Sequence, residues 1–486
     1  MKSNIIARAP RLRPLVACLA IALALSSSHS LGSERGRDAV PRSFEELTAL
    51  RGSVPAFMAE RSGRSQRLVS PLAPADVPRT LVTNCDDDGP GSLRQAFHNA
   101  SSGDVIDLTQ LTCSTITLTS GEMDNSPTAA DVSVEGPGKY LLTIDGNGGS
   151  RVFRHNGSGA LAISGMTITN GSDAGALGGG CIYSAGDIGA FYTHISSCSK
   201  TSSGTDNAFG GAIYARGAAL IAGSTIADNT AHADAANSAG AGVWANRTQI
   251  FVSTISGNTV SGDGSHYARG GGVFSLGDAE ILYSTISGNE ALAGGGVFLV
   301  GAAEELMSIR NSTISGNHAG SGGGVYAKYR PLSVSNSTIT DNTAADQCGG
   351  MFLAYATDLE STIVAKNTAQ NSATADLGSP YAIAISGANN LVMASNLPLP
   401  PDTITLDPML GPLQDNGGYS MTHALLVGSP AIDHGNNTNS ASYDQRLFVA
   451  GSSQVFERVV GPSADIGAFE FGAPDRIFAD GFEGVL

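Results

Sequence analysis

The sequence is poor in charged and aromatic side chains. Charged residues make up 14% and aromatic residues 6%, with a single Trp. Together with 62 glycines, these proportions are typical of a turn-rich β-solenoid rather than a globular enzyme domain. Basic residues are scarce too, because 27 Lys and Arg stand against 43 Asp and Glu, giving a net charge of −16. This shortage of positive charge disfavours nucleic acid and anionic membranes as partners.

Near the N-terminus an apolar run, Leu15–Leu25, is too short to span a bilayer. It follows a basic stretch and precedes the small residues Ser26–Ser30, so residues 1–30 are predicted to be a secretory signal. Its removal takes away four positive and no negative charges and leaves −20 on the mature chain. We therefore expect an exported protein without a transmembrane segment in its mature chain. Residues 31–80 are polar and are predicted to be a linker or pro-like segment without a core.

Five cysteines remain after the signal, and none forms a C-x-x-C motif. In an oxidising compartment cysteines pair more often than they bind metal. Proximity in the sequence predicts the disulfides Cys85–Cys113 and Cys181–Cys198 and leaves Cys348 as a buried thiol. No Ser-His-Asp, zinc-binding or phosphate-loop motif is present.

Residues 168–367 are repetitive, and three columns of side chains appear when the repeats are aligned. The first column is the isoleucine of an S-T-I-like tripeptide, with successive members 27, 31, 29, 31, 28, 25 and 24 residues apart. Its members are Ile168, Ile195, Ile226, Ile255, Ile286, Ile314, Ile339 and Ile363. The second, aliphatic column comprises Ile182, Ile213, Val243, Val273, Val297, Val325 and Met351. The third follows it by one residue and is aromatic: Tyr183, Tyr214, Trp244, Phe274, Phe298, Tyr326 and Phe352. A period of this length predicts stacked structural units.

Each repeat holds short β-branched runs separated by Gly, Asn, Asp and Ser, which indicates strands and turns. The columns persist although the spacing varies, so like side chains must stack on like at ~4.8 Å. The sequence predicts an all-β fold, a right-handed parallel β-helix over residues 81–395, with roughly eight coils in the repetitive region spanning on the order of 40 Å. Ser92 and Gln95 predict a short helical cap at its N-terminal end. Residues 396–472 are predicted to form an irregular C-terminal cap, and residues 473–486 a tail.

An asparagine column gives a second check on the register. It lies three residues after the isoleucine, except that Asn367 follows by four. Its members are Asn229, Asn258, Asn289, Asn317, Asn342 and Asn367. Stacked amides hydrogen-bond along the pile, and Asn tolerates tight turns, so we interpret the column as structural.

The aliphatic and aromatic columns cannot both be inside, because neighbouring residues of a strand face opposite sides. If the aliphatic column is buried, the aromatic rings form an exposed stripe suited to stacking on sugars. If the aromatic rings are buried, the stripe is only core.

Three consecutive coils carry long connections, at residues 199–209, 230–239 and 259–269. Stacking predicts that these loops emerge side by side on one flank, where a rigid scaffold often presents function. The alternative is that a solenoid tolerates insertions there at little cost. The residues predicted to bind a ligand are Asp206, His232, Asp234, Asp263, His266 and Tyr267 in these loops, and Trp244 in the aromatic column.

The C-terminal region contains several specific motifs. They include Leu406-Asp-Pro408, Gly411-Pro-Leu-Gln-Asp-Asn-Gly-Gly418, Gly428-Ser-Pro-Ala-Ile-Asp433 and Asp465-Ile-Gly-Ala-Phe-Glu470. Together they resemble the bacterial choice-of-anchor Q domain, which follows right-handed β-helix repeats in surface proteins. Gly210-Gly-Ala-Ile213 is similar to polymorphic outer-membrane-protein repeats, although their F-x-x-N partner is absent. The resemblance implies an extracellular or cell-surface location in a Gram-negative bacterium.

The resemblance supplies no catalytic residues. A group of charged residues in this region is interpreted as salt bridges and turn caps, and a calcium site is the alternative, without a motif to support it. The group comprises Asp433, Asp444, Arg446, Asp465 and Glu470.

Polysaccharide lyases and hydrolases on this fold need converging carboxylates, or calcium with a basic residue. Within the repeats no column or adjacent pair of columns is acidic, and Lys328 and Arg330 lack carboxylates in their coil. The sequence therefore favours a structural or adhesive binding protein without its own catalysis or cofactor, with a polysaccharide or a host or cell-surface molecule as ligand. A polysaccharide lyase or glycoside hydrolase is the alternative, and the oligomeric state stays open.

Overall fold

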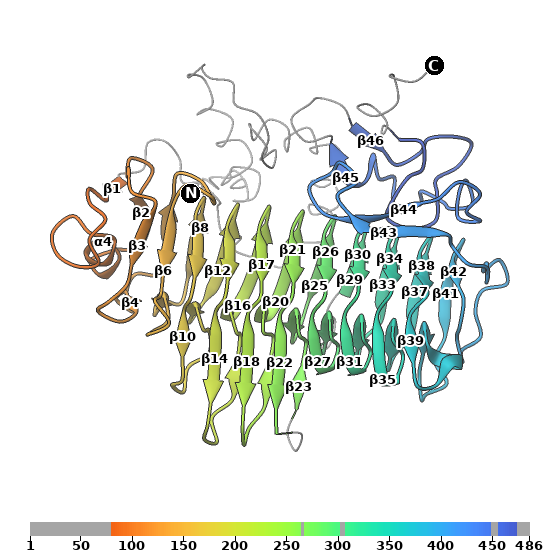
Figure 1. Ribbon diagram of the computed structural model, residues 1–486, viewed down its shortest axis with the longest axis horizontal. Coiled ribbons are helices and arrows are strands. Elements are labelled where there is room, and N and C mark those ends of the chain that lie inside the picture. Colours follow the sequence, from red (N-terminus) through yellow and green to blue (C-terminus); the bar gives the residue numbers. More distant parts are fainter. Residues whose placement is uncertain (1–78, 264–266, 302–306, 449–454, 474–486) are drawn as a thin grey trace, which may run out of the picture.

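The computed structural model describes residues 79–263, 267–301, 307–448 and 455–473. The predicted signal, nearly all of the predicted linker, the tail beyond residue 473 and His266 lie outside these residues. Almost every described element is a short strand, and parallel strands stack into a right-handed β-solenoid of about 11 coils (Figure 1). The predicted fold class is confirmed. None of the helices in the described part of the chain has the length and apolar character that crossing a bilayer requires.

Sheet B contains the isoleucine column and has 11 strands. They are β3 (Thr115–Thr117), β6 (Thr143–Asp145), β9 (Thr167–Thr169), β13 (His194–Ser196), β17 (Thr225–Ala227), β21 (Thr254–Ser256), β26 (Thr285–Ser287), β30 (Thr313–Ser315), β34 (Thr338–Thr340), β38 (Ile363–Ala365) and β42 (Leu391–Val392). Each three-residue strand turns one apolar side chain inward between two outward ones, and the inward isoleucines align from coil to coil.

One member of the predicted isoleucine column is wrong. Val364, not Ile363, pairs with Ile339, and Ile363 takes the outward position beside Thr338. Asn367 therefore follows its column residue by three positions like the other asparagines. The displaced Ile363 packs instead against Ile466 and Phe469 of the predicted C-terminal cap, residues 396–472, which we call the C-terminal segment. This contact explains an apolar residue on an outward face.

Sheet A has 20 strands in two limbs, which join where β16 (Ile213–Ala222) and β20 (Val243–Phe251) run through both. The first limb also contains β4 (Met123–Asp124), β7 (Phe153–His155), β11 (Ile182–Ser184), β24 (Val273–Ser275), β28 (Val297–Leu299), β32 (Val325–Ala327), β36 (Met351–Leu353) and β40 (Leu377–Gly378). The second limb contains β1 (Arg79–Leu81), β2 (Asp104–Asp107), β5 (Val132–Glu135), β8 (Ala160–Ser164), β12 (Asp187–Phe191), β25 (Ala279–Leu282), β29 (Met307–Arg310), β33 (Leu332–Ser335), β37 (Thr357–Glu360) and β41 (Ile385–Ala388).

Sheet C completes each coil: its strands lie in the chain between a strand of sheet B and the first-limb strand of sheet A that follows. Its outgoing strands are β10 (Ser172–Asp173), β14 (Ser199–Ser202), β18 (Thr230–Ala233), β22 (Thr259–Gly262), β27 (Glu290–Ala293), β31 (His318–Ser321), β35 (Thr343–Gln347) and β39 (Thr368–Ala369). In the three long-loop coils the chain returns through β15 (Ala208–Phe209), β19 (Ser238–Ala239) and β23 (Ala268–Arg269). A short 3-10 helix, η2 (Ser372–Thr374), follows β39.

The core is one continuous apolar cluster along the axis of the solenoid, built from the inward columns of the sheets. Its N-terminal end is covered by helix α4 (Leu93–His98), which buries Leu93 and Phe97 completely. Ser92 caps the helix as predicted, because its hydroxyl accepts from the backbone N–H of Gln95. The side chain of Gln95 accepts from the N–H of Gly91, one residue before the capping-box position.

The asparagine column is a hydrogen-bonded ladder, as predicted. Each side-chain oxygen accepts from both the backbone N–H and the side-chain amide of the asparagine in the preceding coil, at 2.8–3.2 Å for Asn229 to Asn258. The ladder starts at the N–H of Cys198, which donates to Asn229. It ends at Asp376, whose carboxylate accepts from Asn367. All six asparagines are buried, so the ladder satisfies backbone groups that water cannot reach.

Both predicted disulfides are present, Cys85–Cys113 and Cys181–Cys198. Cys348 is the free, buried cysteine, also as predicted. It pairs in register with Gly322 and adopts the same left-handed backbone, with φ of 59°. Burial raises the pKa of its thiol to about 12, so Cys348 is an unreactive side chain at a turn position that glycine usually occupies.

The C-terminal segment lies along the side of the solenoid rather than over its open end (Figure 1). It contains two antiparallel pairs, β43 (Leu410–Gln414) with β44 (Thr422–Leu425) and β45 (Tyr443–Phe448) with β46 (Val455–Glu457). The segment covers the outward Thr and Ser side chains of sheet B in β26, β30 and β34, which are buried there and partly exposed in β9 and β21. Gln445 bonds to Thr285 and Thr313, and thereby joins the segment to two coils.

Candidate functional site

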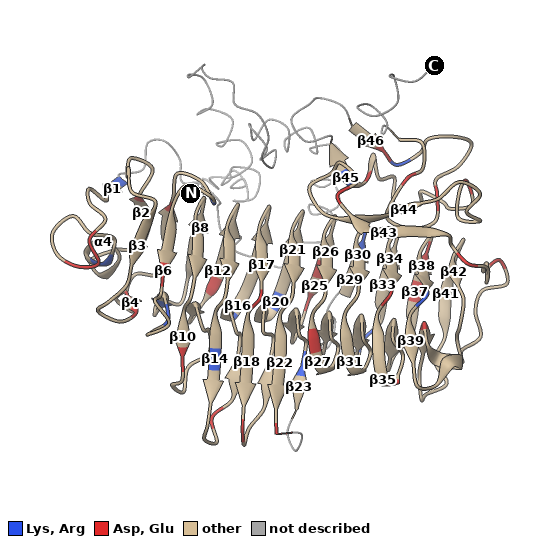
Figure 2. Ribbon diagram, in the orientation of Figure 1, with Lys and Arg blue, Asp and Glu red and all other residues tan. Residues whose placement is uncertain are grey.

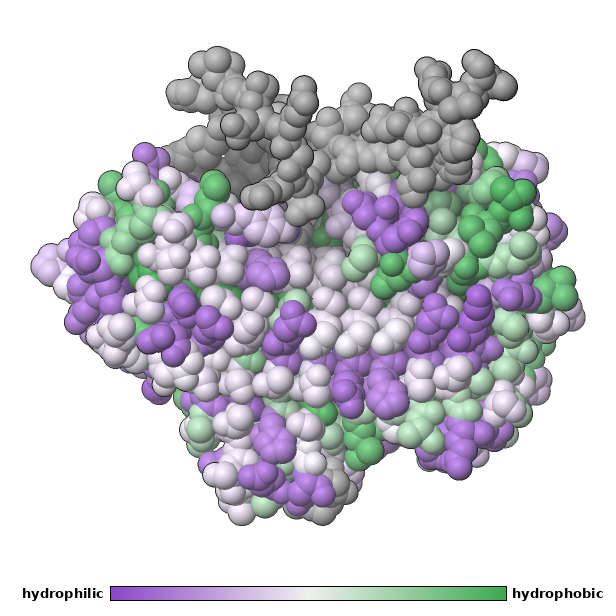
Figure 3. Space-filling view, viewed as in Figure 1, coloured by the Kyte–Doolittle hydropathy of each residue, from purple (hydrophilic) through white to green (hydrophobic). Residues whose placement is uncertain are grey.

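The three long loops emerge side by side, as their stacking predicts. Their outgoing strands β14, β18 and β22 pair in register, and so do the returning strands β15, β19 and β23. Acidic residues lie at the tips of these loops, at the bottom of the view in Figure 2. The space-filling view shows the same tips as largely hydrophilic, whereas the face above them is mixed, with pale areas between purple and green patches (Figure 3).

The structure places His232 and Asp234 together, with 2.9 Å between His232 Nε2 and Asp234 Oδ1. The other ring nitrogen of His232 is 2.9 Å from the Ser261 hydroxyl in the next coil. Asp263 follows the register pair Ala233–Gly262, so its backbone lies one coil, ~4.8 Å, from that of Asp234. Asp206 is exposed on a neighbouring tip. These loop residues form an exposed acidic rim at the tips of the long loops.

The aromatic column is outside the aliphatic core but is itself mostly buried. Consecutive rings are nearly parallel, with centroids 4.3–6.1 Å apart from Trp244 to Phe352. The sequence offered an exposed stripe or a buried core, and the structure shows neither in full. The rings stack on one another along the axis and form a second apolar cluster outside the main core.

This stacking covers the ring of Trp244, the predicted sugar platform. Its ring packs between Tyr214, at 4.4 Å, and Phe274, at 6.1 Å, and Phe209 stacks at 5.5 Å. Trp244 is only 8% exposed. Its ring faces are covered by these neighbours, and a ligand role for Trp244 stays a prediction.

A cavity of about 110 Å³ lies where the long loops end. The connection shortens from residues 259–269 to Glu290–Ala293 in the next coil, and the cavity lies at this step. Eight described residues line the cavity: Tyr267, Ala268, Arg269, Leu292, Ala293, Phe298, Tyr326 and Lys328. Of the residues predicted to bind a ligand, only Tyr267 is among them.

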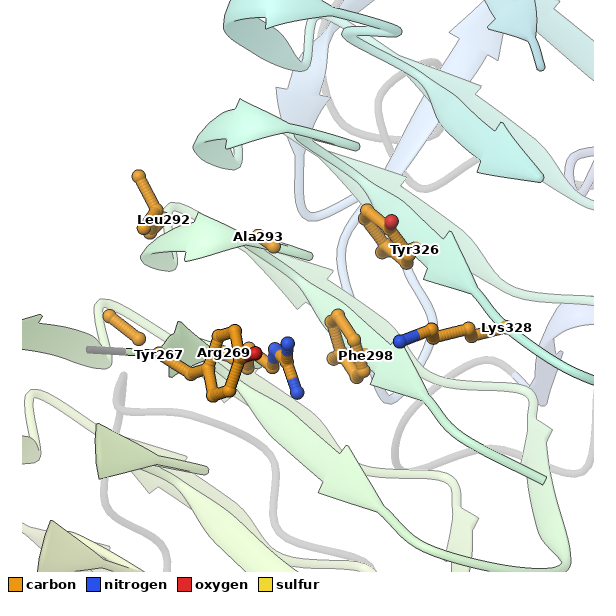
Figure 4. Close-up of a pocket in the computed structure, with 8 residues that line it drawn as sticks. Tyr267, Arg269, Leu292, Ala293, Phe298, Tyr326 and Lys328 are labelled. Atoms are coloured by element: carbon orange, nitrogen blue, oxygen red, sulfur yellow. The ribbon is translucent and has the colours of Figure 1, made fainter. Parts of the chain in front are cut away.

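Two cations dominate the chemistry of this cavity (Figure 4). The Arg269 guanidinium lies 3.6 Å from the centroid of the Tyr267 ring and 5.1 Å from that of Phe298. Lys328 extends towards Phe298 from the opposite side, and its amino group is 4.5 Å from the Tyr329 ring. The eight lining residues include no Asp, Glu or His, so the cavity itself offers no acid or base for hydrolysis.

Three exposed tyrosines that the sequence analysis missed lie in successive coils near the cavity. Tyr329, Tyr355 and Tyr381 lie in the corner between the two limbs of sheet A in three successive coils, and they are 55%, 47% and 59% exposed. We call them the tyrosine corner. Each stands four residues after the aliphatic column, a signal visible in the sequence once that column is extended to Leu377.

The tyrosine corner is contiguous with the cavity. Burial raises the pKa of Tyr326, whose hydroxyl senses the charge of Arg269 and the neighbouring Tyr381 and Tyr329. Tyr329 of the corner contacts Lys328 of the cavity, with 4.5 Å between the amino group and the ring centroid, and the residues that line the cavity include no carboxylate.

The charged group of the C-terminal segment is a buried network. Arg446 pairs with Asp444 at 2.7 Å, and its guanidinium stacks between Phe456 and Phe469 at 4.0 and 3.8 Å. Glu470 accepts from two backbone N–H groups, and burial raises its pKa to about 8. The predicted salt bridge is confirmed for Arg446 and Asp444. Across the described ranges, no three His, Cys, Asp or Glu side chains are grouped so that they could hold a metal ion.

No family model, no curated protein and no solved structure matches this chain.

Proposed function

We propose that this chain is a secreted or surface-displayed binding protein that uses its β-solenoid to present a carbohydrate-binding flank. The observation that carries the proposal is the tyrosine corner beside the cavity of Arg269 and Lys328. Exposed tyrosine rings spaced by one coil offer flat apolar faces to sugars, with a hydroxyl at the edge for hydrogen bonds. Nearby polar groups would then fix the orientation of the ligand.

Export is supported by the two disulfides, which persist in oxidising compartments. It is also supported by the signal-like residues 1–30 and by the resemblance of the C-terminal motifs to the choice-of-anchor Q domain. In this proposal the C-terminal segment stabilises the flank of sheet B and leaves the long loops and the tyrosine corner uncovered, on other parts of the surface.

The proposal is tested by a glycan screen on the oxidised chain from residue 31, recording both binding and the release of reducing or unsaturated ends. We expect binding without product. Tyr355→Ala and Tyr381→Ala should each weaken it about tenfold, because stacking on an aromatic ring contributes on the order of 1–2 kcal/mol. Tyr140→Ala is the control, since Tyr140 is 61% exposed in an early coil. Binding that survives both corner variants would contradict the proposal.

A polysaccharide lyase or hydrolase is the second candidate, and it rests on the neighbouring Asp234 and Asp263 beside His232. Their backbones are one coil apart, and a retaining glycosidase holds its two carboxyl groups about 5–5.5 Å apart, so a pair at this register position could serve that chemistry. Release of sugar ends that is lost in both Asp234→Asn and Asp263→Asn would favour this alternative over the non-enzymatic one.

A further inference from the structure

The cavity at the end of the long loops holds two cations that no described carboxylate neutralises. Neither Arg269 nor Lys328 has an Asp or Glu oxygen within 4.0 Å among the described residues, although 43 acidic residues face 27 basic ones in the chain. Two buried cations are paired by contrast, Arg151 with Glu122 and Asp173, and Lys200 with Asp173. The charge in the cavity is therefore available to a ligand.

Arg269 is also held in position. The Tyr267 ring covers one side of its guanidinium and Phe298 lies nearby, so the aromatic contacts use the flat face of the group. No hydrogen bond joins the N–H groups of Arg269 to another residue in the described ranges, so these donors can serve a ligand. A planar fork of donors matches a carboxylate better than it matches a neutral hydroxyl.

The shape of the cavity limits what enters it. A volume of about 110 Å³ is the space of a few water molecules, too small for an oligosaccharide but adequate for the acidic end of one sugar ring. The wall formed by Tyr267 and the exposed Leu292 bounds it on one side, and Lys328 leads from it to the tyrosine corner. A sugar chain anchored in the cavity by one carboxylate would continue over these tyrosines.

We infer that the cavity binds a uronic acid residue of an acidic polysaccharide, with the sugar carboxylate on Arg269 and Lys328. This inference rests on the proposed carbohydrate-binding function and names its ligand class. Neutral glycans bind to the tyrosine corner alone and more weakly. Arg269 and Lys328 are then specificity-determining residues and not catalytic ones.

The test measures binding of the oxidised chain from residue 31 to oligomers of galacturonate and of mannuronate by titration calorimetry. Methyl-esterified oligogalacturonate carries the same chain without the charge, and dextran sulfate carries sulfate in place of carboxylate. We expect the uronate oligomers to bind at least about tenfold more tightly than the ester, because hydrogen bonds to charged groups are the strong ones. Arg269→Gln and Lys328→Gln should each remove most of that difference between uronate and ester.

Arg216→Gln is the matched control. Arg216 has the register position of Lys328, beside Tyr214 as Lys328 is beside Tyr326, but it lies four coils away, ~19 Å at the strand spacing. Its removal takes away the same charge and should change uronate binding less than about twofold. Equal losses in all three variants would show a non-specific charge effect and overturn the inference. Thermal unfolding of each variant shows whether the solenoid is intact.

The outcomes separate the inference from the proposed function. Uronate and ester oligomers that bind equally, or dextran sulfate that binds as tightly as the uronates, would overturn the uronate assignment. If Tyr355→Ala still weakens the binding of neutral glycans, the carbohydrate-binding function stands without the uronate assignment. If neither charged nor neutral glycans bind, both fail.

Discussion

Replacing Asn317 by alanine should destabilise the solenoid more than any surface change of similar size. The Asn317 oxygen accepts from the N–H and the side-chain amide of Asn289, and its own amide donates to Ile286, Ser315 and Asn342. The Asn289 amide keeps its bond to Ile255, and the Asn342 oxygen keeps the N–H of Asn317. Only the N–H of Asn289 is left without a partner, in a position that is completely buried.

One orphaned buried donor costs ~1–3 kcal/mol, and each of the other lost bonds contributes ~0.5–1.5 kcal/mol, so the loss should be at least about 3 kcal/mol. Denaturant unfolding followed by circular dichroism gives the change in midpoint. Hydrogen exchange by mass spectrometry gives the local effect, which should be largest in the peptide containing Asn289. Local exchange is the better readout, because the stability of a stacked-coil protein is distributed over its coils.

Asn207→Ala is the control for this prediction. Asn207 accepts from the N–H and the amide of Asn237 at 3.1 and 3.2 Å, which is the same pattern, but it is exposed on a long loop. Water can replace its oxygen there, so the loss should stay below ~1 kcal/mol. If Asn317→Ala costs no more than Asn207→Ala, the reasoning that burial gives the ladder its stabilising role is refuted.

Three further predictions concern the ends and flanks of the solenoid. Burial raises the pKa of Asp376 from 3.8 to about 6. The protonated side chain therefore stabilises the fold fully below pH 3.8, and this stabilisation is lost as the pH rises through 6. Asp376→Asn should remove this loss, so the difference in melting temperature between variant and parent should grow from about pH 4 to about pH 7. Removal of the Cys181–Cys198 disulfide with two alanines should cost about 3 kcal/mol, given its separation of 17 residues, whereas Cys181→Ala with Cys198→Asn should lose less because asparagine continues the ladder; equal denaturation midpoints would contradict this. Gln445→Ala should loosen the C-terminal segment and increase hydrogen exchange in β26 and β30, since Gln445 bonds to Thr285 and Thr313; unchanged exchange there would show that other contacts hold the segment.

The fold was predictable because the columns of the repeat express it directly. The inward isoleucines and the buried asparagines follow from a register that the spacing defines, and the two disulfides follow from the proximity of their cysteines in the sequence. The single error in the isoleucine column shows the limit of that reasoning. Ile363 looks like a core residue, but it faces outward into a contact with the C-terminal segment, and no local pattern reports a partner 100 residues further along the chain.

The candidate site was less predictable. The sequence places Tyr267 on a flank with long loops, but the cavity depends on a step between one long loop and the next short one. Lys328 comes from a strand two coils after that loop, so only the stacked structure brings it to Arg269. The burial of Trp244 was not predictable from its own strand, because an outward-facing side chain is buried when its neighbours in the column are also aromatic.

The most direct test of the account is a hydrogen-exchange footprint of the oxidised chain with and without a saturating acidic oligosaccharide. We predict protection in residues 325–330, 351–356 and 377–384, which carry Lys328 and the tyrosine corner, and in the peptide that contains Arg269. Protection confined to residues 199–207 and 230–237, at the tips of the long loops, would contradict the account and place the binding surface on the acidic rim.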